Sequence, residues 1–511
     1  DFGGHAKRNE FDVNGRLILG YGGSESMASP RTEYGKDAKR MLRALGVDPE
    51  RFYSERVFHR KLYPGLGLSR GIFFNKEAFG TDKLVTGDPL VIGFDEFGPK
   101  TPNARNINDV LSDSPLSRDA KDGLASLFGG DKDVMAGMSK ADKISALAKI
   151  SYREFLEKTC RLPKDAADYF QGRLNDNVGL GIDCIAAFDA MEGGLPGAKG
   201  LGIEDAFESH GDEPYIHHFP DGNASIARLI VQSLIPKIAP GRGMDAIVTA
   251  RFDYGQLDLP ANSVRIRLNS TAILVRNEAA RVTVGYVTQG TVHRISAARA
   301  VVATYSSIAR HIVPELPQPQ KDIMAQNVKA PLLYTKVIIR NWQSFIKLGV
   351  HSIAAPMAYH SLVKLDYPVS IGAYKFPVRP DQPIGLQLVH VPLEPNSGLS
   401  GRDQCRAGRA RLLATPFDKI ETEIRSDLDR MLGPGGFSAK DDILAITVNR
   451  WSHGYAYSWN SLYDDVDKGD TLMTEGRAKI GRIAFANSDT GFDAYAHTAI
   501  AEAALAAREI A

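Results

Sequence analysis

The residues with the clearest chemical potential lie near the C-terminus, in the stretch 481–500. A short apolar strand, Ile483 to Ala486, gives way to a polar turn and then to an alanine-rich helix that runs to Ala511. Because the first N–H groups of a helix have no intrahelical partner, such a start can hold an anion or the polar edge of a ring. Ordinary strand-to-helix loops look the same, so this stretch alone leaves a binding site and a plain loop equally open.

Two glycine pairs, Gly3-Gly4 and Gly22-Gly23, flank one apolar segment near the start of the chain. Glycine allows tight turns and lets a ligand come close to the backbone. Gly3-Gly4 comes just after an acidic residue, Asp1, and such a pair lets the backbone turn tightly beside a phosphate-bearing ligand, although a loop explains that pair by itself. Two pairs around one predicted strand favour close approach of the backbone to a ligand.

A lysine and an aromatic segment could serve a reaction. Lys336 lies within the apolar segment 334–339, where a buried ammonium is costly unless it reaches water or an acceptor. Snorkelling at a strand edge is the structural alternative. In the segment 450–459, strand alternation would place five side chains on one face, more than a plain core needs. They are Trp451, His453, Tyr455, Tyr457 and Trp459.

Composition narrows the function classes. The chain has 511 residues, long enough for two or more domains, and a net charge of +1, which gives no reason to expect nucleic acid as a partner. Its three cysteines form no CxxC pair, so neither a disulfide framework nor a cysteine zinc site is predicted. No apolar run is long enough to cross a bilayer, and the start shows no signal peptide.

The elements that would position these residues change along the chain. Residues 24–215 are predicted to be mostly helical, with 101–137 as a long surface connection. The adjacent pair His217-His218 makes a poor metal site, because neighbouring side chains point to different sides. Helices are predicted over 225–235 and 416–431, and strands are predicted over 264–268, 272–275, 281–287 and 300–303.

The glycine pairs carry a family resemblance. Asp-x-Gly-Gly-His at residues 1–5, followed by a strand and Gly22-Gly23, resembles the second glycine motif of FAD-dependent amine oxidoreductases, usually R-x-G-G-R. The opening DFGGHAKRNEF most resembles the spermidine dehydrogenase branch. In that family a G-x-G-x-x-G fingerprint comes earlier, and none occurs in these residues, so the chain resembles a member without its first FAD-binding βαβ unit. Such a chain is expected to be flavin-poor.

The resemblance implies site residues at several positions. Phe485 to Asp489 resembles the family's Phe-Ala-Gly-(Glu/Asp) motif, with asparagine in place of glycine, so Asp489 is expected to accept from ribityl hydroxyls. Lys336 is expected to hold a water near flavin N5, and Trp451, His453, Tyr455 and Tyr457 are expected to line the substrate space. The other implied FAD contacts are Gly3, Gly4, His5, Arg8, Gly22, Gly23, Ala272, Thr304, Thr498 and Ala499.

The implied reaction is dehydrogenation of a polyamine such as spermidine, by hydride transfer from the amine α-carbon to FAD N5. Carboxylates should meet the distant nitrogens, with Glu192, Glu213, Asp464 and Asp465 as candidates. An electron-accepting carrier such as a cytochrome or quinone, a possible haem and a periplasmic location are also implied by the branch, although no CxxCH occurs.

The implied fold class is mixed α/β, with an N-terminally incomplete Rossmann-like FAD domain of the amine oxidase type and a second domain of sheet plus helices. FAD-domain segments are expected at 1–70, 216–330 and 431–511, and substrate-domain segments at 71–215 and 331–430. Two alternatives stay open. One keeps the fold with another substrate, as in desaturases or porphyrinogen oxidases, and the other is a ligand-binding protein without a cofactor.

Overall fold

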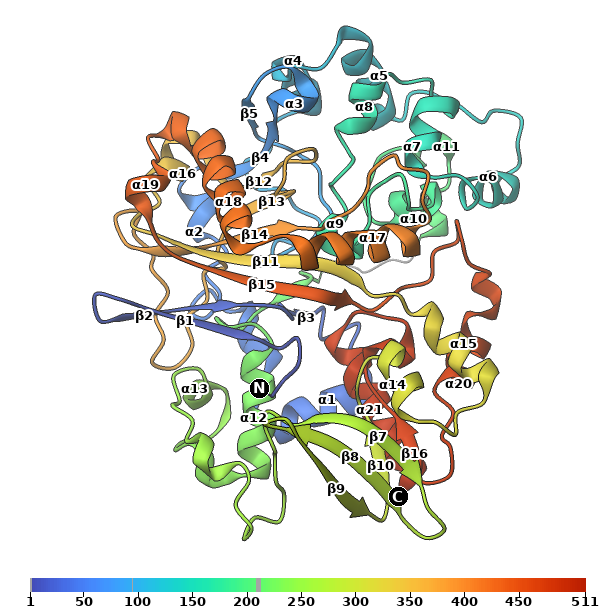
Figure 1. Cartoon of the computed structure of the whole chain (residues 1–511). Coiled ribbons are helices and arrows are strands. Elements are labelled where there is room, and N and C mark those ends of the chain that lie inside the picture. The colour runs from blue at the N-terminus through green and yellow to red at the C-terminus, as the bar shows by residue number, and fades with distance from the viewer. Residues whose placement is uncertain (1, 94, 208–212) are drawn as a thin grey trace.

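The computed structural model describes residues 2–93, 95–207 and 213–511. Asp1, the acid of the first glycine motif, lies outside these ranges. The molecule has two layers of elements, with a large sheet and many helices in the upper part of Figure 1 and a smaller, mixed assembly in the lower part. The chain passes between the two parts repeatedly, and both termini lie in the lower half of the view.

The large sheet has seven strands in the order β15-β11-β14-β13-β12-β4-β5. All neighbours are antiparallel except β12 and β4. The strands are β4 (Ser69–Phe74), β5 (Lys83–Thr86), β11 (Ala330–Ile339), β12 (Val350–Ala354), β13 (Leu362–Leu365), β14 (Ile384–His390) and β15 (Ile443–Tyr455).

Alternation along β11 gives the sheet two different faces. All ten residues of this strand are buried, as expected for an apolar strand covered on both sides. Val337 and Ile339 pack with α18 (Phe417–Leu432) in one core cluster. Tyr334 and Lys336 point the other way, toward the lower part of the molecule.

Helices surround the large sheet. The predicted helix near 416–431 is confirmed as α18, whose Ile420, Ile424, Leu428 and Met431 are fully buried. The others in this half are α2 (Leu62–Gly65), α3 (Lys76–Phe79), α4 (Ile107–Asp113), α5 (Arg118–Gly129), α6 (Lys140–Leu147), α7 (Tyr152–Glu154), α8 (Lys164–Asp168), α9 (Asn175–Val178), α10 (Ala187–Glu192), α11 (Ala198–Leu201), α16 (Gln343–Leu348), α17 (Gly401–Ala414) and α19 (Ala439–Asp442).

One prediction for this half is wrong and another is incomplete. Residues 101–137 are not a bare connection, because Asn106 and Ser117 cap the helices α4 and α5 within it. The segment expected to be mostly helical also contains β4 and β5, which extend the large sheet. The strand β4 is mostly apolar and buried, so its residues do not show the spacing of an amphipathic helix.

The lower part holds small sheets and the remaining helices. The hairpin β1 (Arg8–Val13) and β2 (Arg16–Tyr21) lies between the two parts in Figure 1. The other strands are β3 (Met27–Ala28), β6 (Ile216–His217), β7 (Thr271–Asn277), β8 (Val282–Thr288), β9 (Thr291–Ala297), β10 (Ala300–Val302) and β16 (Ile483–Phe485). The helices are α1 (Lys36–Ala44), α12 (Ala224–Leu234), α13 (Gly243–Ile247), α14 (Ser306–Ile312), α15 (Gln318–Gln326), α20 (Gly469–Gly476) and α21 (Ala496–Ile510).

The strand prediction for 264–304 is partly wrong. The three-stranded sheet is β7-β8-β9, and residues 264–268 form no strand. Arg265 and Arg267 both donate to the carboxylate of Asp258, which ties the segment into a surface loop instead. The predicted returning strand is confirmed as β10, which pairs in parallel with β16.

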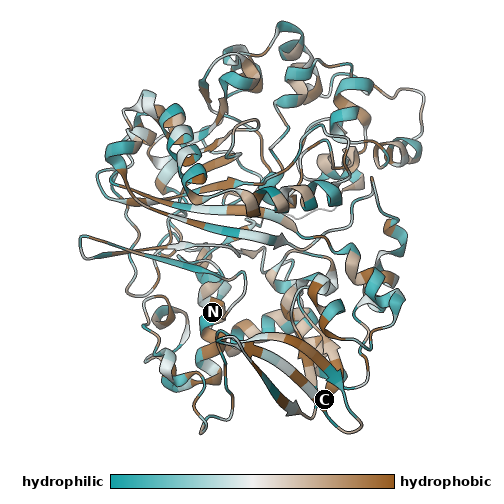
Figure 2. Cartoon of the chain, in the orientation of Figure 1, coloured by the Kyte–Doolittle hydropathy of each residue, from teal (hydrophilic) through white to brown (hydrophobic). Residues whose placement is uncertain are grey.

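Brown, hydrophobic stretches in Figure 2 occur on strands of the large sheet and of the smaller sheets, while the surrounding helices alternate between teal and brown. The three cysteines are free. Among the described residues, none of the helices combines the length and apolar character needed to cross a bilayer. No cluster of three or more histidine, cysteine or acidic side chains in the described part of the chain is arranged to hold a metal ion.

Candidate functional site

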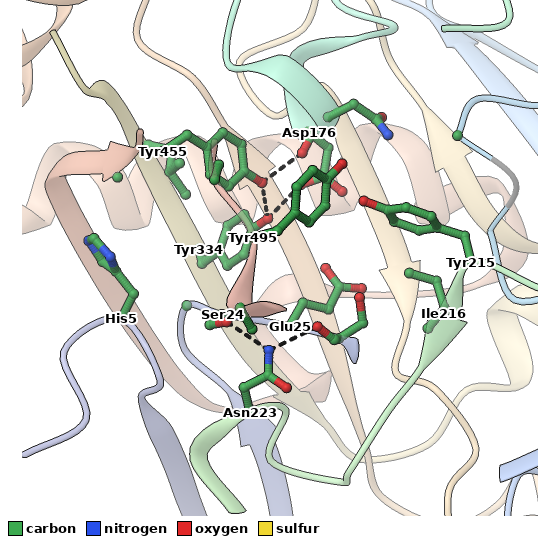
Figure 3. Close-up of a pocket in the computed structure, with 18 of the residues that line it drawn as sticks. His5, Ser24, Glu25, Asp176, Tyr215, Ile216, Asn223, Tyr334, Tyr455 and Tyr495 are labelled. Atoms are coloured by element: carbon green, nitrogen blue, oxygen red, sulfur yellow. Dashed lines mark hydrogen bonds between the residues drawn. The ribbon is translucent and has the colours of Figure 1, made fainter. Parts of the chain in front are cut away.

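A cavity of about 610 Å³ lies between the large sheet and the lower part of the molecule. This volume is in the usual range for small-molecule and cofactor sites. Glycines, the starts of two helices, tyrosines and acids line it. Figure 3 shows Tyr334, Tyr455 and Asp176 on one side of the cavity, opposite Ser24 and Asn223. The N-terminal motif, β11, β15 and the C-terminal stretch therefore meet at one place, although they are far apart in the sequence.

Glycines of both predicted pairs line the cavity. A Cβ on Gly23 would lie 2.2 Å from the carbonyl oxygen of His5, and one on Gly3 would lie 3.2 Å from Ala227 Cβ. A Cβ on Gly4, whose φ is +54°, would meet no atom within 4 Å and would enter open space. At Gly3 and Gly23 the backbone packs so closely against other protein atoms that a side chain would not fit. At Gly4 the backbone faces open space.

Two long helices begin at the cavity. Asn223, Ile226 and Ala227 at the start of α12 line it, as do Tyr495 and Ala499 at the start of α21. No side chain of the described residues caps either start. Each helix start carries unpaired N–H groups and a partial positive charge, so both favour an anionic or strongly polar ligand.

Asn223 illustrates why α12 is left uncapped. Its side-chain amide donates to Ser24 Oγ and to the Ser26 carbonyl, each at 2.8 Å, and so binds the segment after Gly22-Gly23 instead of its own helix (Figure 3). The N–H groups of α12 are consequently available to the cavity.

Tyr334, Tyr455 and Asp176 form a tight cluster of oxygens on the cavity wall (Figure 3). The two hydroxyl oxygens are 2.5 Å apart, Tyr334 Oη is 2.8 Å from Asp176 Oδ1, and Tyr455 Oη is 2.6 Å from the Asp176 carbonyl oxygen. Each of these three contacts needs one proton to be a hydrogen bond, and the two phenols supply only two. Burial raises the pKa of the Asp176 carboxyl, and a proton on that carboxyl would supply the third.

Lys364 lies in the middle of the cavity's charged groups. Its Nζ is 3.0 Å from Glu25 Oε1 and donates to Tyr367 Oη at 2.8 Å. Burial opposes its charge, but the neighbouring carboxylates, Glu25 above all, raise the pKa of Lys364 above its ordinary value. In the register of the sheet, Lys364 on β13 and Lys336 on β11 both pair with Gln387 on β14, so the two lysines share one face.

Five acids line the cavity, and three of them are ion-paired: Glu25 with Lys364 at 3.0 Å, Asp88 with Arg173 at 2.5 Å, and Asp95 with Arg70. Glu96 and Asp176 have no ion pair with another described residue. Burial raises the pKa of both carboxyls. Both carboxyls line the cavity without a salt-bridge partner, so a cation bound in the cavity would favour their charged forms.

Lys336, the predicted catalytic lysine, does not line the cavity. It is fully buried, with Nζ 3.0 Å from Asp366 Oδ1 and 4.1 Å from the centre of the Tyr21 ring. A Cβ on Gly20 would lie 2.6 Å from Lys336 Cε, so the glycine makes room for the lysine beneath the hairpin β1–β2. The hairpin thus separates Lys336 from the space that Lys364 reaches.

The closing stretch takes the predicted course of strand, turn and helix start. Asn487 has φ +144°, in a region that favours glycine, and is fixed by its amide donating to the Thr304 carbonyl at 2.6 Å. Asn487 and Ala499 line the cavity, whereas Thr498 donates to Asp493 beside it. Asp489 is fully buried outside the lining, 2.5 Å from Lys329 Nζ, and accepts from Ser306 N at 2.9 Å.

The remaining predicted residues divide between the cavity and its surroundings. His5, Trp451 and Tyr455 line it. Those outside the lining are Arg8, Gly22, Ala272, Thr304, His453 and Tyr457. Arg8 holds Asp221 at 2.8 Å, and Tyr457, beyond the end of β15, donates to Asp464 at 2.8 Å. The candidate acids Glu192, Glu213, Asp464 and Asp465 also lie outside the lining, so that expectation is corrected: the cavity acids are Glu25, Asp88, Asp95, Glu96 and Asp176.

Comparison with known proteins adds the fold. No family model matches the chain, and no curated protein matches it. Among solved structures, a double mutant of putrescine oxidase is 12% identical with a TM-score of 0.54, and the wild type bound to putrescine is 12% identical with a TM-score of 0.52. In both cases the match covers 99% of this chain and 90% of the other. The chain has the putrescine oxidase fold.

The putrescine oxidase fold confirms the predicted fold class, a mixed α/β architecture of the amine oxidase type. Sequence reasoning missed several cavity residues within this fold: Glu25, Asp176, Tyr215, Tyr334, Lys364 and Tyr495. Two of them had a usable signal. Glu25 comes two residues after Gly22-Gly23, and Tyr334 shares a strand face with Lys336 by alternation.

The oxygen cluster leads to a pH-dependent stability prediction. Because burial raises the pKa of Asp176, the folded protein keeps that proton where the unfolded chain has released it, and stability falls as pH rises above the ordinary pKa of an aspartic acid. Lys364 opposes this effect and Glu25 adds to it. Asp176→Asn imitates the protonated acid, so its advantage over the wild type should grow from pH 4 to pH 8 in urea unfolding. An advantage that is constant with pH would contradict the raised pKa.

Proposed function

We propose that this protein binds FAD in the cavity and uses it to oxidise a polyamine. The observation that carries the proposal is that two chemically different sets of groups line a single cavity. Bare glycine backbone and two uncapped helix starts make up one set, and the tyrosines with two acids that have no ion pair among the described residues, Glu96 and Asp176, make up the other. The first suits an anionic, flat cofactor and the second a cationic substrate.

The backbone N–H groups that line the cavity are suited to binding FAD. Gly4 leaves open space where a side chain would stand, and the N–H groups at the starts of α12 and α21 suit phosphate oxygens and the polar edge of a flavin ring. FAD, when bound, would supply the oxidising chemistry by accepting hydride from the α-carbon of an amine. Haem is not part of what we propose.

The chain's own residues would bind and orient the amine. Trp451, Tyr455 and Tyr334 offer ring faces to a methylene chain and its ammonium groups. We propose that Lys364, and not Lys336, takes the role of the lysine beside the flavin, because Lys364 lines the cavity and Lys336 does not. Its pairing with Glu25 keeps its charge neutralised, so it adds little repulsion toward a cation.

The two unpaired acids favour a substrate with more than one positive charge. Asp176 contacts Tyr334 on β11, whereas Glu96 is buried and Arg70 of β4 is the cation that most lowers its pKa. The charges of both acids act on Lys364 of β13, which lies between β11 and β4 in the sheet, so both acids face the same space. A monoamine carries one charge for these two acids, whereas a polyamine such as spermidine carries a charge for each of them.

FAD binding provides the first test. Ala499 lines the cavity on α21, and Ala503, one turn further on, is exposed. We expect Ala499→Phe to weaken FAD binding about 10-fold or more, because overpacking costs about 1–3 kcal/mol, while Ala503→Phe leaves it unchanged. Flavin fluorescence in an equilibrium titration measures both. The titration should extend to high FAD concentration, because the described residues contain no dinucleotide fingerprint.

Each outcome separates the candidate functions. Saturable binding lost only in Ala499→Phe supports FAD in this cavity. Equal binding by both variants would place FAD elsewhere, and no saturable binding would favour a ligand-binding protein without a cofactor. Bound FAD that no amine reduces would favour another substrate on the same fold, as in desaturases or porphyrinogen oxidases.

A further inference from the structure

A second, smaller pocket of about 130 Å³ lies behind one wall of the main cavity. Asn327 and Val328 line this pocket, and the next residue, Lys329, lines the main cavity. By the same measure a single water needs about 10–15 Å³, so the smaller pocket has room for a polyatomic ion.

Three arginines line this pocket, and no acid is among its lining residues. Arg406 and Arg409 come from α17, where spacing of three places them on one face, and Arg310 comes from α14. Guanidinium groups that converge in this way repel one another unless an anion lies between them.

The partners of these arginines leave most of their charge uncompensated. Arg409 donates to two neutral acceptors, the carbonyls of Ser452 at 2.9 Å and Lys329 at 3.0 Å. Burial, together with the charge of Arg406, lowers the pKa of Arg409. Arg406 is paired with Asp403 at 2.7 Å, but both side chains are more than half exposed, so water screens that pair.

Two further polar atoms at the pocket are buried without a hydrogen-bond partner among the described residues: Arg310 Nε and Ser307 Oγ. Leaving a buried donor unsatisfied costs about 1–3 kcal/mol. A guanidinium N–H and a hydroxyl side by side are the donors that bind phosphate oxygens in proteins. The orphaned donors and the uncompensated charge thus point to the same kind of ligand.

We propose that this pocket binds a phosphate-type oxyanion, as free phosphate or as the phosphoryl group of a small molecule. The donors reach the pocket from two helices, which suits a tetrahedral ion better than a flat carboxylate. The site is separate from the main cavity and does not depend on the function proposed for it. Because Arg409 also holds the Lys329 and Ser452 carbonyls, the bound anion would stabilise that wall of the cavity.

Calorimetric titration with inorganic phosphate, at constant ionic strength in chloride, tests the proposal. We expect saturable binding at one site, weakened at least about 10-fold by Arg310→Gln and by Arg406→Gln. Arg406 is exposed, so its variant keeps a test available if Arg310→Gln fails to fold. Arg379→Gln, which alters an exposed arginine paired with Asp381, is the matched control and should bind phosphate like the wild type.

Several results would overturn the proposal. These are non-saturable heats, equal affinity in Arg310→Gln and Arg379→Gln, or binding of acetate with no binding of phosphate. A competition experiment between FAD and phosphate completes the test. If FAD displaces phosphate from the wild type, the pocket belongs to the cofactor site and is not separate; unchanged phosphate affinity in the presence of FAD supports a distinct site.

Discussion

Glu96→Gln should lower kcat/KM for spermidine by about 30-fold or more, because removing one partner of a buried charge pair costs about 2–5 kcal/mol. Glu96 is 8% exposed, lines the cavity and has no ion pair with another described residue. Burial raises the pKa of its carboxyl, and a substrate ammonium beside it would favour the charged form. The loss should come mainly through KM, since this acid would hold an ammonium away from the reacting carbon. Steady-state rates of the FAD-loaded protein measure it.

Glu192→Gln is the matched control for this prediction. Glu192 was a candidate from the sequence, but it is exposed on α10 and lies outside the cavity lining. Its variant should oxidise spermidine like the wild type. A second comparison uses n-butylamine, which carries one charge: Glu96→Gln should leave that reaction within about twofold of the wild type. Equal losses with both amines would show that Glu96 supports the fold instead of binding the distal ammonium.

Lys336→Met should lower the free energy of unfolding by about 3–5 kcal/mol, because it leaves a buried carboxylate without its partner. That carboxylate belongs to Asp366, 3.0 Å from Lys336 Nζ, and both side chains are almost inaccessible to solvent. The resemblance to amine oxidoreductases implies a role for Lys336 in flavin chemistry. The structure instead places it beneath the hairpin β1–β2, so stability is the property expected to change most. Urea unfolding measures it.

The double variant Lys336→Met with Asp366→Leu should recover much of this loss, because it removes both buried charges. Lys347→Met, on the exposed surface of α16, is the control and should unfold like the wild type. If Lys336→Met keeps wild-type stability and slows flavin reduction, Lys336 acts at the flavin and our account of the hairpin is wrong.

Local sequence signals were enough for the elements with strong patterns. The apolar stripe of α18, the strand β11 and the strand-turn-helix at 483–510 all lie where they were predicted. Glycine pairs and a helix start have local causes, namely backbone freedom and unpaired N–H groups, so they are visible without a structure. The predicted meeting of the two chain ends followed from a family resemblance.

Local sequence patterns could not predict which charged residues line the cavity. Asp176, Glu96 and Lys364 come from a short helix, a loop and a short strand, and only the packing of distant segments brings them together. Lys336 and Lys364 are both lysines in apolar strands on one sheet face. What separates them is the hairpin that covers one and leaves the other open, a tertiary contact that no local pattern contains.

The most direct test of the central claim is anaerobic mixing of the FAD-loaded protein with spermidine. The flavin absorbance band is followed in a single turnover. We predict that spermidine bleaches the flavin, that putrescine does so less efficiently, and that n-butylamine needs a concentration at least about 30-fold higher for the same rate, the cost of one lost charge pair of about 2 kcal/mol. Bound flavin that stays oxidised with all three amines would contradict the account.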